Sequence, residues 1–324
     1  MRRFMIQRVS GILVVLVLVL SLAFLMLQAT PGGPELAYLG VNPTPEKRAA
    51  VLSQLGLDEP LWSQYLHFVG NALTLDLGVS LTTQRPVSEL LWQHVPVTLE
   101  LGLASFLTWT IIGLASGFIA AARRGGLVDG AVRVVTVTGL SIPSFWLGTV
   151  CVVVFGLYVR GILPSSGWVS FGEDPLGNLR SLVLPAFTLG MGSAAIVART
   201  LRASLIEQLD SDHVTFGRAM GLSDRHLLSR VALRNSVIPT VTVVGLMLGL
   251  FISGTVLIEN VFNVPGLGQL IVKSFASHDY PVAIACTLFT ALVFLVSNLV
   301  VDLLYYAINP RIRVQYASMG RGSR

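Results

Sequence analysis

The sequence predicts an all-α membrane protein with six transmembrane helices, and three observations support this fold class. Of its 324 residues, 53% are hydrophobic and only 12% are charged, whereas a soluble domain carries about 25% charged residues. Six apolar stretches approach or exceed the roughly 20 residues that a helix needs to cross a bilayer. Basic residues gather in alternate connecting segments, as expected for a protein that crosses the membrane several times.

The first apolar stretch runs from Val9 to Ala29 and follows three arginines, Arg2, Arg3 and Arg8. The arrangement is similar to a signal peptide, but the apolar core of a signal peptide has only about 7–15 residues. We therefore predict that residues 1–30 form a first transmembrane helix that is retained.

Residues 31–96 form a long connection outside the membrane. Thr44 before Pro45 predicts a helix start, because Thr caps helices and Pro suits their first position. A second helix is predicted to begin within 57–66, and 86–92 forms a third amphipathic piece. We expect this segment to be too short and too weakly patterned for an independent domain.

Two histidines of this segment, His67 and His94, have side chains that could bind a metal ion. Neither lies near a cluster of Cys, Asp or Glu, so we expect both to be polar residues near the membrane surface. Trp62, Tyr65 and Phe68 suit the same interface.

Five further transmembrane helices are predicted, at 97–122, 132–159, 182–201, 240–261 and 282–308. Residues 97–313 would form the transmembrane core, and 314–324 a tail. An even number of spans places both termini on the same side.

Orientation follows from the distribution of basic residues. With a cytoplasmic N-terminus, 16 of the 22 Lys and Arg residues lie in cytoplasmic segments. The six on the other side are Lys47, Arg48, Arg85, Arg160, Arg180 and Lys273. The positive-inside rule therefore predicts cytoplasmic termini, and the net charge of +5 reflects topology rather than a nucleic-acid surface.

The longest cytoplasmic connection, 205–239, is predicted to form a helix–glycine–helix finger. Gly221 suits the position just past a helix end, and Ser223 can cap the next helix, with Asp224 in its first turn. Pro239 is expected to open the following apolar stretch.

A translocation path is predicted where polar or helix-breaking residues enter the apolar stretches. Pro143 interrupts the third stretch, between Ser141 and Phe145, and such a break is tolerated where protein or a water-filled cavity satisfies the backbone. Most glycines at four-residue spacing in the spans are expected to serve helix packing.

Ionisable and amide side chains at membrane depth are also candidates for the path. They are Glu259 near the outer end of the fifth stretch, and Asn298 and Asp302 in the sixth. Glu100 also lies at depth, near the outer surface. Asp302 lies where Arg311 or Arg313 could pair with it.

Catalytic and nucleotide-binding signatures are missing from the sequence. It has no phosphate-binding G-x-x-x-x-G-K-[ST] string, and no Ser/His/Asp or Cys/His arrangement on a soluble scaffold. Cys151 and Cys286 lack metal-ligand spacing and are expected to be core residues. We therefore expect a non-catalytic chain with no cofactor and no metal of its own.

Several strings resemble permease subunits of ABC importers, in the dipeptide/oligopeptide/nickel branch. They span Thr30 to Arg313, nearly the whole chain. The strings are Thr30-Pro31-Gly32, Gly56-Leu57-Asp58, Asp76-Leu77-Gly78, Arg85-Pro86-Val87, Ser141 to Gly148, Arg218-Ala219 with Gly221-Leu222-Ser223, Glu259 to Gly268, and Asn309-Pro310-Arg311-Ile312-Arg313.

The resemblance implies a type I ABC importer permease fold in a bacterial or archaeal inner membrane. It also implies a second homologous permease subunit, two ATPase subunits that bind ATP and Mg²⁺, and an extracytoplasmic solute-binding protein that delivers a peptide. The finger would then be the loop that couples to the ATPases. Its predicted coupling residues are Thr215, Phe216, Gly217, Arg218, Ala219, Met220, Gly221, Leu222, Ser223 and Asp224.

Two departures from the family pattern concern single residues. Gly217 stands where the branch usually keeps Ala, which would loosen the helix by about 1 kcal/mol. His278 stands where Arg is common before Asp279-Tyr280-Pro281.

Alternatives remain for the cargo and for the class of transporter. Nickel chelates, glutathione or oligosaccharides are cargoes within the same family. A self-sufficient channel or secondary carrier is the alternative of another class, but no pairs of midplane ionisable residues or inverted half-helices support it.

Overall fold

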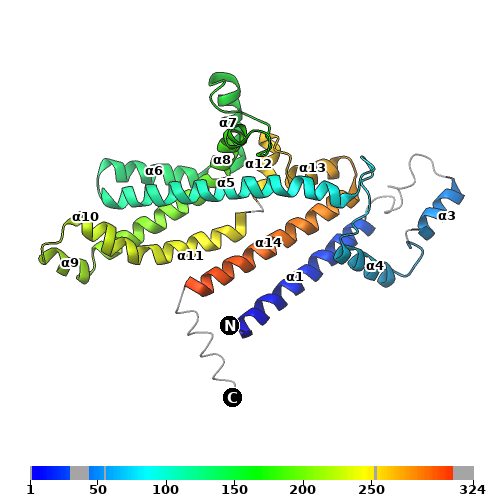
Figure 1. Cartoon of the computed structure of the whole chain (residues 1–324), viewed down its shortest axis with the longest axis horizontal. Helices are drawn as coiled ribbons and strands as arrows, with labels where there is room; N and C mark the ends of the chain where they lie inside the picture. Colours follow the sequence, from blue (N-terminus) through cyan, green and yellow to red (C-terminus); the bar gives the residue numbers. More distant parts are fainter. Residues whose placement is uncertain (1, 30–43, 55, 252–253, 309–324) are drawn as a thin grey trace, which may run out of the picture. The chain divides into compact units, whose positions relative to one another are not determined.

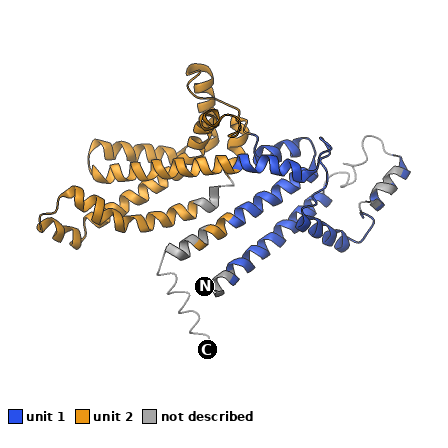
Figure 2. Ribbon diagram, viewed as in Figure 1, with its two compact units in different colours: residues 1–98, 265–296 blue, residues 99–264, 297–324 orange. Residues whose placement is uncertain are grey.

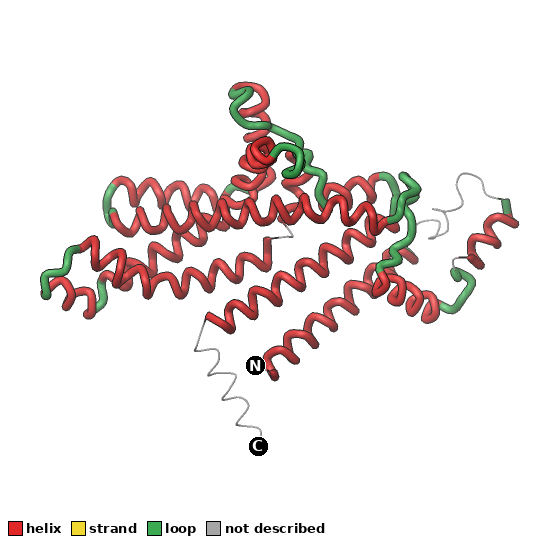
Figure 3. The backbone as a smooth tube through the Cα atoms, in the orientation of Figure 1, coloured by secondary structure: helices red, strands yellow, loops and turns green. Residues whose placement is uncertain are grey.

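The computed structural model describes residues 2–29, 44–54, 56–251 and 254–308. These residues form helices joined by loops, and the described part of the chain contains no strand (Figure 3). Two compact units are present, residues 1–98 with 265–296 and residues 99–264 with 297–324 (Figure 2).

The first unit contains α1 (Arg2–Gln28), α3 (Pro45–Gln54), α4 (Leu61–Thr74), the start of α5 (Val87–Ala122), α13 (Leu267–Ala276) and most of α14 (Tyr280–Ile308) (Figure 1). One apolar cluster joins the start of α5 to α13 and α14 around Val87, Leu91 and Cys286. A second joins α1 to α14 and α4, with Phe68 and Ala72 of α4 packed against it. The predicted helices after Thr44 and within 57–66 are confirmed.

The second unit contains the rest of α5, α6 (Leu127–Ser141), α7 (Ser144–Val153) and the π-helical turn η1 (Val154–Tyr158). It continues with α8 (Pro175–Leu209), α9 (Asp212–Ala219), α10 (Asp224–His226), the π-helical turn η2 (Leu227–Ala232), α11 (Leu233–Phe251) and α12 (Thr255–Phe262). Helix α8 is its centre, because α6, α7, α11 and α12 all contact it.

Close approach of α5 and α8 depends on glycine. A Cβ on Gly113 would lie 2.8 Å from the carbonyl oxygen of Ala194, and one on Gly117 would lie 2.6 Å from that of Ala198. Both distances are shorter than van der Waals contact, so only glycine fits here without a shift of the backbone. The predicted packing role of these two glycines is confirmed.

Five described helices are long and apolar enough to cross a membrane, and two bent helix pairs also pass this test together. One pair is α6 and α7, which meet at an angle of 102°. The break falls at Ile142 and Pro143, where the sequence predicts an interruption. The other pair is α12 and α13, and α13 follows directly after Pro265-Gly266.

Several helix boundaries differ from those predicted. The amphipathic piece at 86–92 is not separate, because α5 runs without a break from Val87 through Pro96. Helix α8 begins earlier than predicted, at Pro175, because the carboxylate of Asp174 accepts hydrogen bonds from two backbone N–H groups of its first turn.

The prediction that Pro239 opens a new stretch is wrong, because Pro239 lies inside α11. The finger's second helix therefore continues directly into the next span. Of the predicted stretch 240–261, the part up to Phe251 lies in α11 and the part from Thr255 lies in α12.

Candidate coupling site

The finger between α8 and α11 forms around two short helices joined by a tight turn. Helix α9 ends at Ala219, and Gly221 has a φ of 86°, a left-handed conformation that glycine adopts without strain. The Ser223 hydroxyl then accepts a hydrogen bond from the backbone N–H of His226. The helix–glycine–helix geometry and the Ser223 cap predicted from the sequence are confirmed.

One face of the finger is buried. Val214 and Gly217 of α9 are buried, as are Leu227 and Ala232 of η2. A Cβ on Gly217 would lie 2.8 Å from Cδ2 of Leu227. The missing methyl group therefore lets α9 pack closely on η2, which offsets part of the helix propensity that Gly217 loses.

Three large apolar side chains of the finger are exposed. Phe216 is 67% exposed and Met220 is 69% exposed, and Leu222 is also exposed. Arg218, between Phe216 and Met220 in the sequence, is also exposed, and its guanidinium Nε lies 3.1 Å from the Asp224 carboxylate. Large apolar side chains grouped on a polar projection are typical of a protein-binding surface.

Two ion pairs hold the base of the finger, and sequence reasoning missed both. Asp129 at the start of α6 is buried, and its carboxylate accepts hydrogen bonds of 2.6 and 2.8 Å from Arg202 of α8. It also accepts one from the backbone N–H of Gly125. Arg124 donates to Asp210, immediately after α8, at 2.7 Å. An Asp at the start of an apolar stretch was the available signal for this contact.

Apolar and amide contacts complete this base. Ala121 at the end of α5, Leu201 and Leu205 of α8, and Ala232 form one buried cluster. Asn235 of α11 donates to the Gln208 side chain of α8. The two arms of the finger are therefore fixed to α8 and, through Asp129, to α6.

The residues predicted for the translocation path are distributed over several elements. Ser141 and Phe145 are exposed on either side of the α6–α7 break, and Pro143 caps α7. Glu259 is fully buried in α12, and Asn298 is half-buried in α14.

Two cavities in the described part of the chain are lined by other residues and by none of these. Asp302 lies in α14, but its side chain and its predicted partners Arg311 and Arg313 fall outside the described residues. The path assignment therefore remains a prediction.

Glu100 has a structural role in the second unit. Its carboxylate accepts hydrogen bonds from Trp168 Nε1 at 3.2 Å and from Asn178 Nδ2 at 3.1 Å. Asn178 also donates to the carbonyl oxygen of Val169. These contacts attach the loop before α8 to α5.

Metal ligation finds no support among the described residues. No group of three or more His, Cys, Asp or Glu side chains is placed to hold a metal ion there. His67 is exposed, with its Nδ1 3.5 Å from Glu59, and His94 contacts the carbonyl oxygen of Leu90.

Comparison with known proteins identifies two matching family models. Residues 113–314 match the binding-protein-dependent transport system inner membrane component, and residues 1–102 match the N-terminal model of the same membrane components.

Relatives of known name match over nearly their full length. The dipeptide transport system permease protein DppB of Lactococcus lactis is 35% identical over 97% of this chain and 100% of its own. The glutathione transport system permease protein GsiC of Escherichia coli K12 is 38% identical over 97% of this chain and 99% of its own.

A solved structure shares the fold. An inward-facing form of the MetNI methionine ABC transporter contains a chain that aligns with a TM-score of 0.51 and 19% identity, covering 68% of this chain and 96% of that one. The match supports the predicted type I permease fold. Together, the helical membrane architecture, the two family models and the full-length relatives show that this chain belongs to the family of binding-protein-dependent transport system inner membrane components, the permease subunits of ABC importers.

Proposed function

We propose that this permease forms half of a translocation pathway for di- or oligopeptides, delivered by an extracytoplasmic binding protein. The cargo assignment is supported by relatives named for dipeptide, peptide and glutathione transport, since glutathione is itself a short peptide. Glutathione is therefore the second candidate cargo, and nickel chelates or oligosaccharides are less well supported.

The proposed topology has six spans, cytoplasmic termini and an outer segment after α1. In it, the bent pair of α6 and α7 counts as one span, and α13 forms a short re-entrant or interfacial helix on the outer side. The distribution of 16 against 6 basic residues supports this orientation. It places the finger in the cytoplasm.

Energy for transport would come from partner subunits. Two ATPases would bind ATP and Mg²⁺, and their closure would move the finger and open the path outward; hydrolysis would return it. The observation that carries this proposal is the exposed apolar group of Phe216, Met220 and Leu222 on a finger fixed to α8. A rigid base would transmit movement of the tip to α8 and α11.

Transport in this scheme would use a path between this chain and a second, homologous permease. Ser141, Pro143, Phe145, Glu259, Asn298 and Asp302 are the residues proposed to line it. The break between α6 and α7 supports the first three, because an interrupted helix at membrane depth needs a polar or protein-filled environment.

Affinity purification of the chain from its native membrane in mild detergent tests the coupling proposal. We expect a second permease and P-loop ATPases to copurify with the wild-type chain. Phe216→Glu should lower ATPase recovery by roughly tenfold or more, as for loss of an aromatic contact at the centre of an interface.

The matched control is Ser229→Glu, which adds the same charge at an exposed position outside the apolar group, and ATPase recovery should be unchanged. If the Phe216→Glu chain recovered as much ATPase as the wild type, the finger would not be part of the ATPase-binding interface. Recovery of the wild-type chain alone, still moving solute in vesicles without ATP, would favour a channel or carrier instead.

A further inference from the structure

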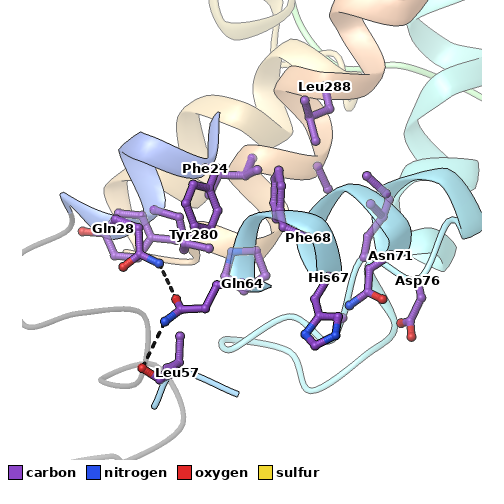
Figure 4. A pocket seen from close by; sticks show the side chains of 17 residues that line it. Phe24, Gln28, Leu57, Gln64, His67, Phe68, Asn71, Asp76, Tyr280 and Leu288 are labelled. Carbon is purple, nitrogen blue, oxygen red and sulfur yellow. Dashed lines mark hydrogen bonds between the residues drawn. The ribbon is translucent and has the colours of Figure 1, made fainter. Parts of the chain in front are cut away.

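A cavity in the first unit has no role in the proposed transport cycle. It has a volume of about 230 Å³ and lies among α1, α4 and the start of α14 (Figure 4). Leu57 and the loop at Asp76–Gly78 also line it.

The cavity changes from apolar to polar along its length. Figure 4 shows Phe24, Phe68 and Leu288 toward one end, and Gln64, His67 and Asp76 toward the other. The amides of the polar rim are held in place, since Gln28 donates to Gln64 at 2.7 Å and Gln64 donates to the carbonyl oxygen of Leu57. The lining is therefore amphipathic, and its polar end has a defined geometry.

The position of the cavity along the spans matches this polarity. Gln28 is the last residue of α1 and Tyr280 the first of α14, and both helices are long enough to span a membrane. The rim thus lies where two spans meet the membrane surface. Ile284 and Leu288 lie one and two helical turns deeper along α14.

Helix α4 indicates that lipid surrounds this site. Its outer face exposes Trp62, Leu66 and Leu73, while Phe68 and Ala72 pack inward. An amphipathic helix with exposed Trp and Leu side chains is suited to lie in the interfacial plane of a bilayer. The cavity lies against the inner face of this helix.

We propose that the cavity binds one phospholipid with an ethanolamine headgroup, whose acyl chain packs against Phe24, Phe68 and Leu288. The described lining residues include the Asp76 carboxylate and no Lys or Arg. Asp76 attracts the ammonium group, and the absence of a lining cation disfavours anionic headgroups. Asn71 and His67 line the same end of the cavity as Asp76 (Figure 4), and their side chains would donate to the phosphate.

Lipid analysis of the purified complex tests this site. The whole transporter is reconstituted in nanodiscs with equal amounts of phosphatidylethanolamine and phosphatidylglycerol, and tightly held lipid is measured by native mass spectrometry. We expect the wild type to retain phosphatidylethanolamine, and Asp76→Asn to lower that retention roughly tenfold through loss of a charge-assisted contact. Asp76→Lys should invert the preference.

Two further variants keep the test decisive. Asp58→Asn removes an exposed carboxylate of the same segment outside the cavity, and retention should not change. Ala72→Leu fills the apolar part, so retention of both lipids should fall without a change of preference. Equal retention of the two lipids by the wild type, or no inversion with Asp76→Lys, would overturn the proposal.

Competition with peptide separates lipid from cargo. The bound lipid is challenged with a peptide that has a free amino terminus and with the N-acetylated form of the same peptide. Displacement by the free peptide alone would identify the cavity as a substrate site and would overturn the proposal. We expect neither peptide to displace the lipid.

Discussion

Two buried aspartates, Asp129 and Asp279, perform different tasks in the two units. Asp129 is 1% exposed and bonds the guanidinium of Arg202, which joins two helices of the second unit. Asp279 is 2% exposed and accepts only from neutral donors among its described partners. These are the Ser80 and Thr82 hydroxyls and the backbone N–H groups of Leu81 and Thr82.

The difference is between joining helices and shaping a loop. A charge pair depends on both charges being present, because removal of one leaves the other without compensation at low dielectric. A carboxylate held by hydroxyls and backbone N–H groups fixes the conformation of the segment that donates them. Asp129 therefore supports the base of the finger, whereas Asp279 orders the loop before α5.

The largest effect is expected from Asp129→Asn. It leaves Arg202 without its anion, and the loss should be about 2–3 kcal/mol of stability, below the usual range for a fully buried pair because Arg202 is partly exposed. Thermal unfolding of the purified complex measures it.

Asp210→Asn is the matched control for Asp129, because its pair with Arg124 is solvent-exposed. It should change stability by less than about 1 kcal/mol. If Asp129→Asn and Asp210→Asn lost similar amounts of stability, the buried ion pair would contribute no more than the exposed one.

A smaller effect is expected from Asp279→Asn, about 1–2 kcal/mol. The Ser80 and Thr82 hydroxyls can reverse to accept from the new amide, but the two backbone N–H groups cannot. The loop at 78–86 should become more sensitive to limited proteolysis while the finger does not. If the rate of cleavage in this loop did not change, Asp279 would not be what keeps the loop ordered.

Gly221→Ala should cost about 1 kcal/mol, because a residue with a Cβ is strained at positive φ. We expect its main consequence in transport rather than in assembly, since the turn sets the angle between α9 and α10. ATP-dependent uptake in proteoliposomes should fall while ATP hydrolysis continues. Gly161→Ala is the control, since Gly161 has a similar φ of 85° outside the finger. Normal uptake by Gly221→Ala would contradict this role.

Gly217→Ala should have the smallest effect, within about 0.5 kcal/mol. The gain of roughly 1 kcal/mol in helix propensity is offset by the shift that Cδ2 of Leu227 must make. Thermal unfolding of the variant and of the wild type, under the same conditions, measures the net change in stability. A loss above about 2 kcal/mol would show that Leu227 cannot move.

Local chemistry explains what could be predicted from the sequence. Hydrophobic runs predicted the membrane helices, Pro143 predicted the break between α6 and α7, and Gly221 with Ser223 predicted the finger. Each of these features depends on residues close together in the chain, whose conformational preferences act without distant partners. The strings that resemble ABC importer permeases predicted the permease fold, and the family models and relatives confirm it.

Contacts between distant residues were decided only by the tertiary structure. Nothing in the sequence pairs Asp129 with Arg202, or Asp279 with Ser80, because a buried carboxylate takes whichever donors the packed helices bring to it. The start of α5 also involves distant contacts: the helix runs through Pro96, and its first turns are buried against α13 and α14. The cavity beside α4 likewise exists only because three elements, far apart in sequence, leave space between their side chains.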